Sequence, residues 1–255
     1  MTVAITKRAF TTFAVVAAGA LALTGCVIGG NAPTPPSDST FDNGSSTASD
    51  TPLNAAVGGV TFTSDGVATS DDAPNLGAPT ETDAIDVGVV FDPMCPHCAV
   101  FEAEYGEKLA QLVESGQITL TMYPVAFVAG PVSEAGANAF LAVAAYAPES
   151  AWEFQQFMLA TGLNQGNLDA ETLKTLATEA GADDPRVADA IDNGTFVSFV
   201  QDQTAALLGN EIPGTGVEVT GTPLIFAEGV TLESATFDGS VDDVFASLED
   251  QVAKS

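Results

Sequence analysis

Cys95 and Cys98, two cysteines separated by two residues, are the pair in this chain whose type and spacing best support chemistry. An apolar run precedes them and an amphipathic helical pattern follows. A thiol at a strand-to-helix junction faces backbone N–H groups and the positive end of the helix dipole. Both effects favour the thiolate, so we expect Cys95 to have a lowered pKa and raised reactivity. Cys98 lies one turn further on, where it is placed to close a disulfide with Cys95.

Pro96 and His97 lie between the two cysteines. Proline suits the first turn of a helix, because its missing N–H is not needed there. His97 is the only histidine in the chain. If it is protonated or donates a hydrogen bond, it would be a second stabiliser of the Cys95 thiolate.

Two other interpretations of the cysteine pair, a zinc site and a purely structural disulfide, are less favourable. A zinc site needs four ligands, and the cysteines and histidine of the whole chain are Cys26, Cys95, Cys98 and His97, of which Cys26 has another use. A purely structural disulfide of so short a span would restrain little unfolded-chain entropy. We therefore favour a redox-active pair that needs no metal and no cofactor beyond the cysteines themselves.

The composition sets the class of protein. The 255 residues, 46% hydrophobic, allow one ordinary domain with appendages or two small domains. Three cysteines are too few for a disulfide-stapled scaffold. The net charge is −28, from 34 acidic and 6 basic residues, which excludes nucleic-acid binding through phosphates. The acidity is spread along the chain, so we interpret it as a solvated surface, with selection of basic partners as the alternative.

Residues 1–25 have the pattern of an export signal. Lys7 and Arg8 precede an apolar run, and Leu23-Thr24-Gly25-Cys26 matches the lipobox of bacterial lipoproteins. An ordinary secretory signal or an uncleaved anchor is the alternative, but the run is short for a membrane span. We expect a signal peptide over 1–25, a lipid on Cys26, and export to an oxidising compartment where a disulfide persists.

Residues 26–55 predict a disordered tether, because Ser, Thr, Asp, Pro and Gly dominate and little apolar surface is available for burial. The folded domain is then expected over 56–255. Its predicted strands are Val60-Thr61-Phe62-Thr63 paired with Gly66-Val67-Ala68, a central strand Ile85 to Asp92, Gln117 to Tyr123, Val217 to Val219, and a hairpin of Leu224 to Phe226 with Val230 to Leu232. Residues 71–82 are expected to form a loop.

Helical patterns fill the rest of the domain. The helix after the cysteines should run to about Ser115 and end at Gly116, with a buried face of Val100, Phe101, Tyr105, Leu109 and Leu112. Residues 131–209 predict four or five short helices with no strand between them, including one capped by Ser133, one capped by Asp169, and one from Pro185 to Gly194. A last helix is expected from Val241 to Val252.

Thr222-Pro223 stands at the start of an apolar strand, where a proline needs explanation because it cannot donate to a ladder. Either the strand lies at an edge, or the bond is cis in a functional loop.

These features together resemble the thioredoxin fold, and the helical block with Cys95-Pro96-His97-Cys98 is similar to the DsbA family of thiol:disulfide oxidoreductases. Asp92 and Gly221-Thr222-Pro223 also fit that pattern. The resemblance covers roughly residues 84–253. It implies an α/β thioredoxin-like fold with an inserted helical domain, Cys95 as nucleophile, Cys98 as resolving cysteine, and His97 as stabiliser of the thiolate. It also implies that Thr222 and Pro223 form a cis-proline loop lining a peptide-binding groove.

One position departs from the family pattern. Many members carry a buried carboxylate six residues before the nucleophile, which helps proton transfer to the resolving thiol, and Val89 stands there in this chain. A water or Asp92 would have to substitute, or the transfer is slower.

The lipobox predicts a lipid-anchored protein on the extracytoplasmic side of a bacterial cell membrane, and the resemblance implies that it oxidises thiols of exported proteins. A membrane-bound, quinone-linked partner would reoxidise it. A disulfide reductase or isomerase is one alternative, although isomerases of this kind are usually dimers, no dimerisation segment is clear, and we expect a monomer. A non-catalytic thioredoxin-fold binding protein is the other.

Overall fold

The computed structural model describes residues 58–68, 84–165, 167–227 and 229–232. The expected signal peptide, the lipidation site Cys26, the tether, the loop 71–82 and the helix Val241 to Val252 lie outside the described residues.

The described strands form one six-stranded sheet in the order β2-β1-β4-β3-β5-β6. The strands are β1 (Val60–Thr63), β2 (Gly66–Val67), β3 (Ile85–Phe91), β4 (Ile118–Pro124), β5 (Leu224–Ala227) and β6 (Val230–Thr231). β3 pairs in parallel with β4 and antiparallel with β5. All seven residues of β3 are buried, as its nearly continuous apolar sequence predicts for a central strand. Both predicted hairpins, β1–β2 and β5–β6, are confirmed.

Capping residues, prolines and glycines mark the starts and ends of several helices. They are α1 (Pro96–Glu114), α2 (Pro131–Tyr146), the 3₁₀ turn η1 (Pro148–Ser150), α3 (Ala151–Gln165), α4 (Ala170–Glu179), α5 (Pro185–Asn193) and α6 (Val197–Leu207). Asp169 caps α4 by accepting a hydrogen bond from the Thr172 N–H, as predicted. Gly194 ends α5 in the left-handed region, with φ of 61°, where glycine has no Cβ to strain.

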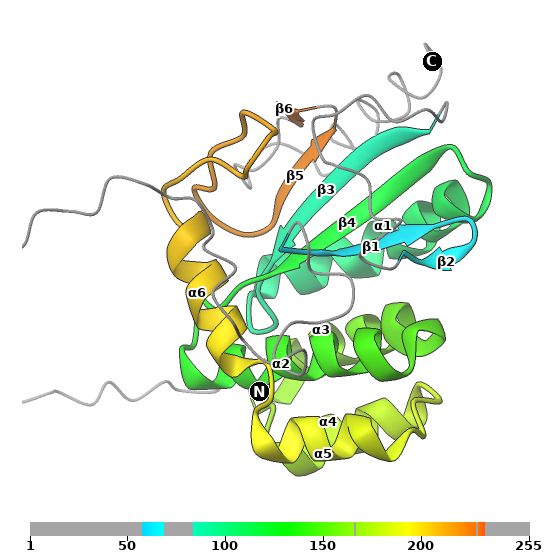
Figure 1. Ribbon diagram of the computed structural model, residues 1–255, viewed down its shortest axis with the longest axis vertical. Helices are drawn as coiled ribbons and strands as arrows, with labels where there is room; N and C mark the ends of the chain where they lie inside the picture. Colours follow the sequence, from blue (N-terminus) through cyan, green and yellow to red (C-terminus); the bar gives the residue numbers. More distant parts are fainter. Residues whose placement is uncertain (1–57, 69–83, 166, 228, 233–255) are drawn as a thin grey trace, which may run out of the picture. The chain divides into compact units, whose positions relative to one another are not determined.

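Helices α2 to α6 are all inserted between β4 and β5. In Figure 1, α2 and α3 lie between the sheet and the pair α4 and α5. α1 packs against β4 and against α3. The fold is therefore a thioredoxin-like sheet with an inserted helical block, as the sequence predicts.

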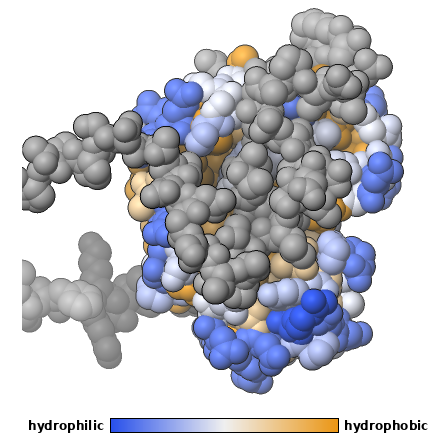
Figure 2. Space-filling view, in the orientation of Figure 1, coloured by the Kyte–Doolittle hydropathy of each residue, from blue (hydrophilic) through white to orange (hydrophobic). Residues whose placement is uncertain are grey.

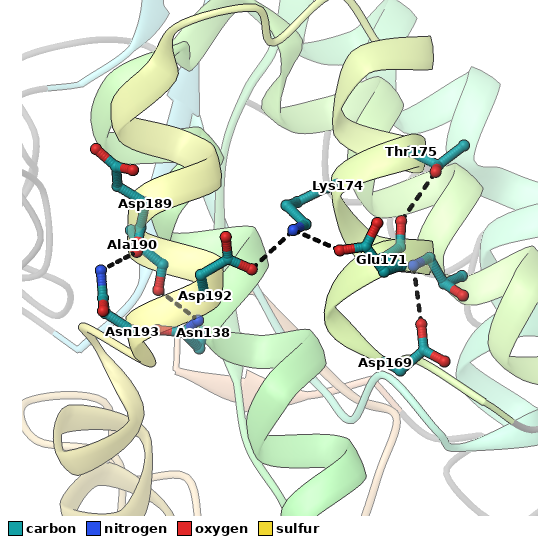
Figure 3. Close-up of polar contacts among 10 residues, drawn as sticks. Asn138, Asp169, Glu171, Lys174, Thr175, Asp189, Ala190, Asp192 and Asn193 are labelled. Carbon is teal, nitrogen blue, oxygen red and sulfur yellow. Dashed lines mark hydrogen bonds and ion pairs between the residues drawn. The ribbon is translucent and has the colours of Figure 1, made fainter.

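A lysine bridges the two helices of the insertion that lie farthest from the sheet. The Lys174 Nζ lies 2.7 Å from a Glu171 oxygen on its own helix and 2.8 Å from an Asp192 oxygen on α5 (Figure 3). Figure 2 shows hydrophilic side chains over this end of the domain. The polar character fits a surface exposed to solvent.

Three details of the sequence interpretation are wrong. Val100 is 40% exposed, because it lies about 200° around the helix from the buried Cys98. Ser133 does not cap α2, which begins at Pro131 with Gly130 before it; its hydroxyl makes the contacts described below. Val217 to Val219 is not a sheet strand. It makes two isolated bridges, Leu208 to Val219 and Glu211 to Glu218, and its valines are buried in a smaller core cluster with β5.

Among the described residues, no helix is both long and apolar enough to cross a membrane.

Candidate redox site

The strand register brings the two halves of the site together. Val90 of β3 pairs with Leu224 of the antiparallel β5, so the residues just before Leu224 lie beside the end of β3. The Thr222-Pro223 bond there is cis, which decides between the two explanations for that proline. The Cys95 thiol donates to the backbone carbonyl oxygen of Thr222 at 3.3 Å.

Cys95 stands at the N-cap position of α1, with Pro96 in its first turn. Its side chain is only 5% exposed. The pKa of the Cys95 thiol is lowered to about 5, foremost because the Cys98 thiol donates a hydrogen bond to the thiolate. The Thr222 hydroxyl and the backbone N–H groups of Cys98 and His97 add to this, while burial opposes it. The lowered pKa predicted from the helix start is therefore present, and a thiol–thiol hydrogen bond is its largest cause.

Cys98 differs sharply from Cys95. It is 2% exposed, and burial raises the pKa of its thiol well above the ordinary value, followed in effect by the neighbouring Cys95. Both cysteines are free thiols in this structure. Near neutral pH, Cys95 is thus a thiolate and Cys98 a neutral thiol. This arrangement suits Cys95 as a nucleophile and Cys98 as a resolving cysteine.

His97 has an exposed side chain. Its contribution to the Cys95 thiolate comes from the backbone N–H. The predicted role of the imidazole as a stabiliser of the Cys95 thiolate therefore stays a prediction.

The Asp92 side chain, directly after β3, is fully buried. Its Oδ1 accepts from the Met94 N–H at 2.8 Å and the Ser133 hydroxyl at 2.7 Å. Its Oδ2 accepts from the N–H groups of Phe127 at 2.6 Å and Val128 at 2.8 Å. Both oxygens are occupied by these donors, so the structure gives no support to Asp92 as the substitute proton acceptor. The sequence pattern singles out Asp92, but it does not predict the hydrogen bonds from Phe127, Val128 and Ser133.

A second buried carboxylate, Glu102, was not foreseen. It is 7% exposed, and its two oxygens accept from the side-chain amides of Gln155 and Gln156 on α3, at 3.2 and 3.0 Å. Burial raises the pKa of Glu102. Its spacing could have revealed it, since position 102 lies one turn after Cys98 and one turn before the buried Gly106.

Glu102 also lines a pocket of about 580 Å³ between α1 and α3. Small side chains from both helices form much of its wall, together with Trp152 and Phe157. Within the described ranges, no three His, Cys, Asp or Glu side chains come together as a metal site.

The mixed sheet with its inserted helical block is a thioredoxin-like fold, and the cysteine pair lies at the start of α1. Solved structures of DsbA-type proteins share this fold. The solved structure of MdbA, a thiol-disulfide oxidoreductase from Actinomyces oris, matches with a TM-score of 0.58 and 21% identity, over 78% of this chain and 89% of that one. DsbA of Mycobacterium tuberculosis in its oxidised form matches with a TM-score of 0.57 and 21% identity, over 76% and 92%. BdbD from Bacillus subtilis matches with a TM-score of 0.57 and 17% identity, over 78% and 95%.

A family model described as thioredoxin matches residues 77–242. The chain therefore belongs to this thioredoxin family. No curated protein matches it in a sequence comparison.

Proposed function

We propose that this protein is an extracytoplasmic protein dithiol:disulfide oxidoreductase that oxidises the thiols of exported proteins. The observation that carries the proposal is the split between the two thiols, with the pKa of Cys95 lowered to about 5 and that of Cys98 raised. The likeness in fold to thiol-disulfide oxidoreductases supports it.

In the oxidised protein, a substrate thiolate attacks the Cys95 sulfur of the Cys95–Cys98 disulfide. A mixed disulfide forms between Cys95 and the substrate, and Cys98 leaves and takes up a proton. A second substrate thiolate then attacks the substrate sulfur, which forms the product disulfide and releases Cys95 as a thiolate. The pair has gained two electrons, and the substrate has lost two.

The stability of the Cys95 thiolate supports the proposed direction of electron flow. A thiol of low pKa is a good leaving group, and stabilising the reduced form makes the oxidised form a stronger oxidant. In this proposal His97 adds to the stabilisation, and Thr222 and Pro223 line the groove that receives the substrate peptide. A disulfide reductase or isomerase would use the same residues with the opposite or no net flow of electrons.

The proposal also includes the cellular setting. Export through residues 1–25 and a lipid on Cys26 would anchor the domain to the cell membrane, tethered by residues up to about 55. A membrane-bound partner would reoxidise the cysteines, and the domain would act as a monomer. Mass spectrometry of the protein purified from membranes tests the lipid, and a Cys26→Ser variant should lose it and leave the membrane fraction.

The reduction potential of the cysteine pair tests the direction, by equilibration in glutathione buffers. A value near about −120 mV supports a disulfide donor, whereas a value near about −270 mV overturns this direction and indicates a reductant. A Cys95→Ser variant tests catalysis itself. It should keep its fold and lose all thiol oxidation, whereas a binding protein whose cysteines pair only structurally would keep its function.

A further inference from the structure

One buried carboxylate joins three segments at the redox site. The first is the catalytic turn, residues 92–95, which links β3 to α1. Here the Asp92 side chain accepts from the Met94 N–H, and the Asp92 backbone carbonyl accepts from the Cys95 N–H at 3.0 Å. These two bonds close a tight turn. The turn fixes the direction in which Cys95 enters the helix.

The other oxygen of Asp92 reaches the loop after β4. The consecutive N–H groups of Phe127 and Val128 both point at Oδ2. The third segment is the first turn of α2, from which the Ser133 hydroxyl donates to Oδ1 and accepts from the Ala129 N–H at 3.1 Å. The start of the helical insertion is thereby tied to the catalytic turn.

Packing holds the same turn from two sides. A Cβ atom on Gly136 of α2 would lie 2.6 Å from the Pro93 Cβ, and one on Gly162 of α3 would lie 2.6 Å from the Pro93 carbonyl oxygen. Both distances are shorter than real Cβ contacts allow, so the two helices approach the turn as closely as glycine permits. The close packing at Gly136 and Gly162 and the hydrogen bonds to Asp92 together hold the catalytic turn in place.

We propose that Asp92 is a positioning residue for the thiol chemistry, holding Cys95 against Thr222 and the backbone N–H groups of the first turn of α1 by tying the catalytic turn to residues 127–128 and Ser133. The inference rests on the proposed function, because the thiolate that it positions is the reacting group. The four donors to the Asp92 side chain are three backbone N–H groups and the Ser133 hydroxyl, none of which is a reacting atom.

Position and charge have opposite effects here, which makes the role testable. As a negative charge beside Cys95, Asp92 disfavours the thiolate, so removing the charge alone would lower the pKa of Cys95. As the residue that fixes the turn, Asp92 keeps the Cys95 thiolate against its hydrogen-bond donors, so losing Asp92 would raise the pKa of Cys95. An Asp92→Asn variant separates the two, because its amide keeps the shape but turns one acceptor into a donor that faces existing donors.

The experiment measures the thiolate absorbance of the reduced protein against pH, and the equilibrium constant of the pair against glutathione, for the full chain. We expect Asp92→Asn to raise the pKa of Cys95 by about one unit and to weaken the oxidant about tenfold, which is about 30 mV. Ser133→Ala removes one of the four side-chain bonds and should act in the same direction with a smaller effect. Asp86→Asn is the matched control, since Asp86 is buried on β3, the strand that leads into the turn, but accepts from the Thr119 hydroxyl instead.

A lowered or unchanged pKa in a folded Asp92→Asn protein overturns the proposal. If that variant does not fold, Ser133→Ala decides, with the same two outcomes. The wild-type potential is measured alongside: a reductant's potential would overturn the proposed direction of electron flow, while the comparison between variants would still test the role of Asp92.

Discussion

The Cys95 sulfur lies 3.3 Å from the backbone carbonyl oxygen of Thr222, a residue 127 positions further along the chain. The contact exists because β5 pairs antiparallel with β3, which brings the residue before Pro223 to the start of α1. Thr222 serves Cys95 in two ways. Its carbonyl accepts from the protonated thiol, and its hydroxyl stabilises the thiolate.

Replacing Thr222 by valine should therefore raise the pKa of Cys95. Valine keeps the β-branched shape and removes the hydroxyl. A hydrogen bond to a charged group contributes about 1.5 kcal/mol, so the expected rise is about one pKa unit. Thr222→Ser keeps the hydroxyl and is the control. The rate of alkylation by iodoacetamide as a function of pH measures the shift, and equal profiles for the two variants would contradict the role of the hydroxyl.

The Cys95 thiolate should make the stability of the reduced protein depend on pH in a way that the oxidised protein does not share. Its folded pKa of about 5 is below the roughly 8.5 of a free thiol. The stabilisation is therefore full above the unfolded pKa and is lost as the pH falls through about 5. At pH 7 it is on the order of 2 kcal/mol.

Urea unfolding of the reduced and the oxidised protein, at pH 7 and at pH 5, measures this difference. Carboxylates common to both forms cancel in the comparison. The reduced form should lose about 2 kcal/mol more than the oxidised form between the two pH values. A constant difference would show that the thiolate does not stabilise the fold.

Gly162→Ala should disturb the catalytic turn from the side of α3. The new Cβ would lie 2.6 Å from the Pro93 carbonyl oxygen, so the backbone must shift, at a cost of about 1–3 kcal/mol. We expect a higher pKa of Cys95 and slower oxidation of a reduced substrate protein. Gly106→Ala is the control, since its Cβ meets side-chain atoms of Glu102 and Gln156 and not the catalytic turn. It should leave the pKa of Cys95 unchanged; a shift as large as that of Gly162→Ala would argue against a specific effect.

Glu102→Gln should stabilise the protein at neutral pH. Burial raises the folded pKa of Glu102, so the wild type has its full stability below the unfolded pKa and loses part of it as the pH rises through the folded pKa. A neutral amide avoids this loss. The new amide N–H group would face the Gln155 amide, which can turn over so that its Oε1, without a hydrogen-bond partner among the described residues, accepts from it.

The expected gain is about 1 kcal/mol at pH 7 and none at pH 4. Urea denaturation at the two pH values measures it. Glu107→Gln is the matched control, because Glu107 lies on the same helix and lines the same pocket but is exposed. A gain of equal size at both pH values would mean that the charge of Glu102 is not the cause.

Much of the fold was predictable because its signals are local. The apolar run of β3, the Asp169 cap and the Gly194 stop each depend on residues a few positions apart. The cysteine pair at the start of α1 was predictable for the same reason. For Pro223 the sequence leaves two explanations, an edge strand or a cis bond, because tertiary packing decides between them.

The contacts that the sequence analysis missed depend on distant segments. Ser133 reads as a helix cap from its neighbours, but its hydroxyl bonds to Asp92, 41 positions earlier. Val217 to Val219 has the pattern of a strand, yet its valines are buried in a loop packed near β5. Glu102 reads as a surface residue until Gln155 and Gln156 are brought beside it.

The distance along the chain between Cys95 and Thr222 also sets the order in which the site is completed. While the polypeptide is being made, Cys95 emerges long before the segment that supplies Thr222. Until β5 is in place beside β3, Cys95 lacks the Thr222 hydroxyl and the buried surroundings of the finished site. The part of the pKa lowering at Cys95 that depends on Thr222 is therefore acquired only once β5 has paired with β3, whereas the donors of Cys98 and His97 are close by in the chain.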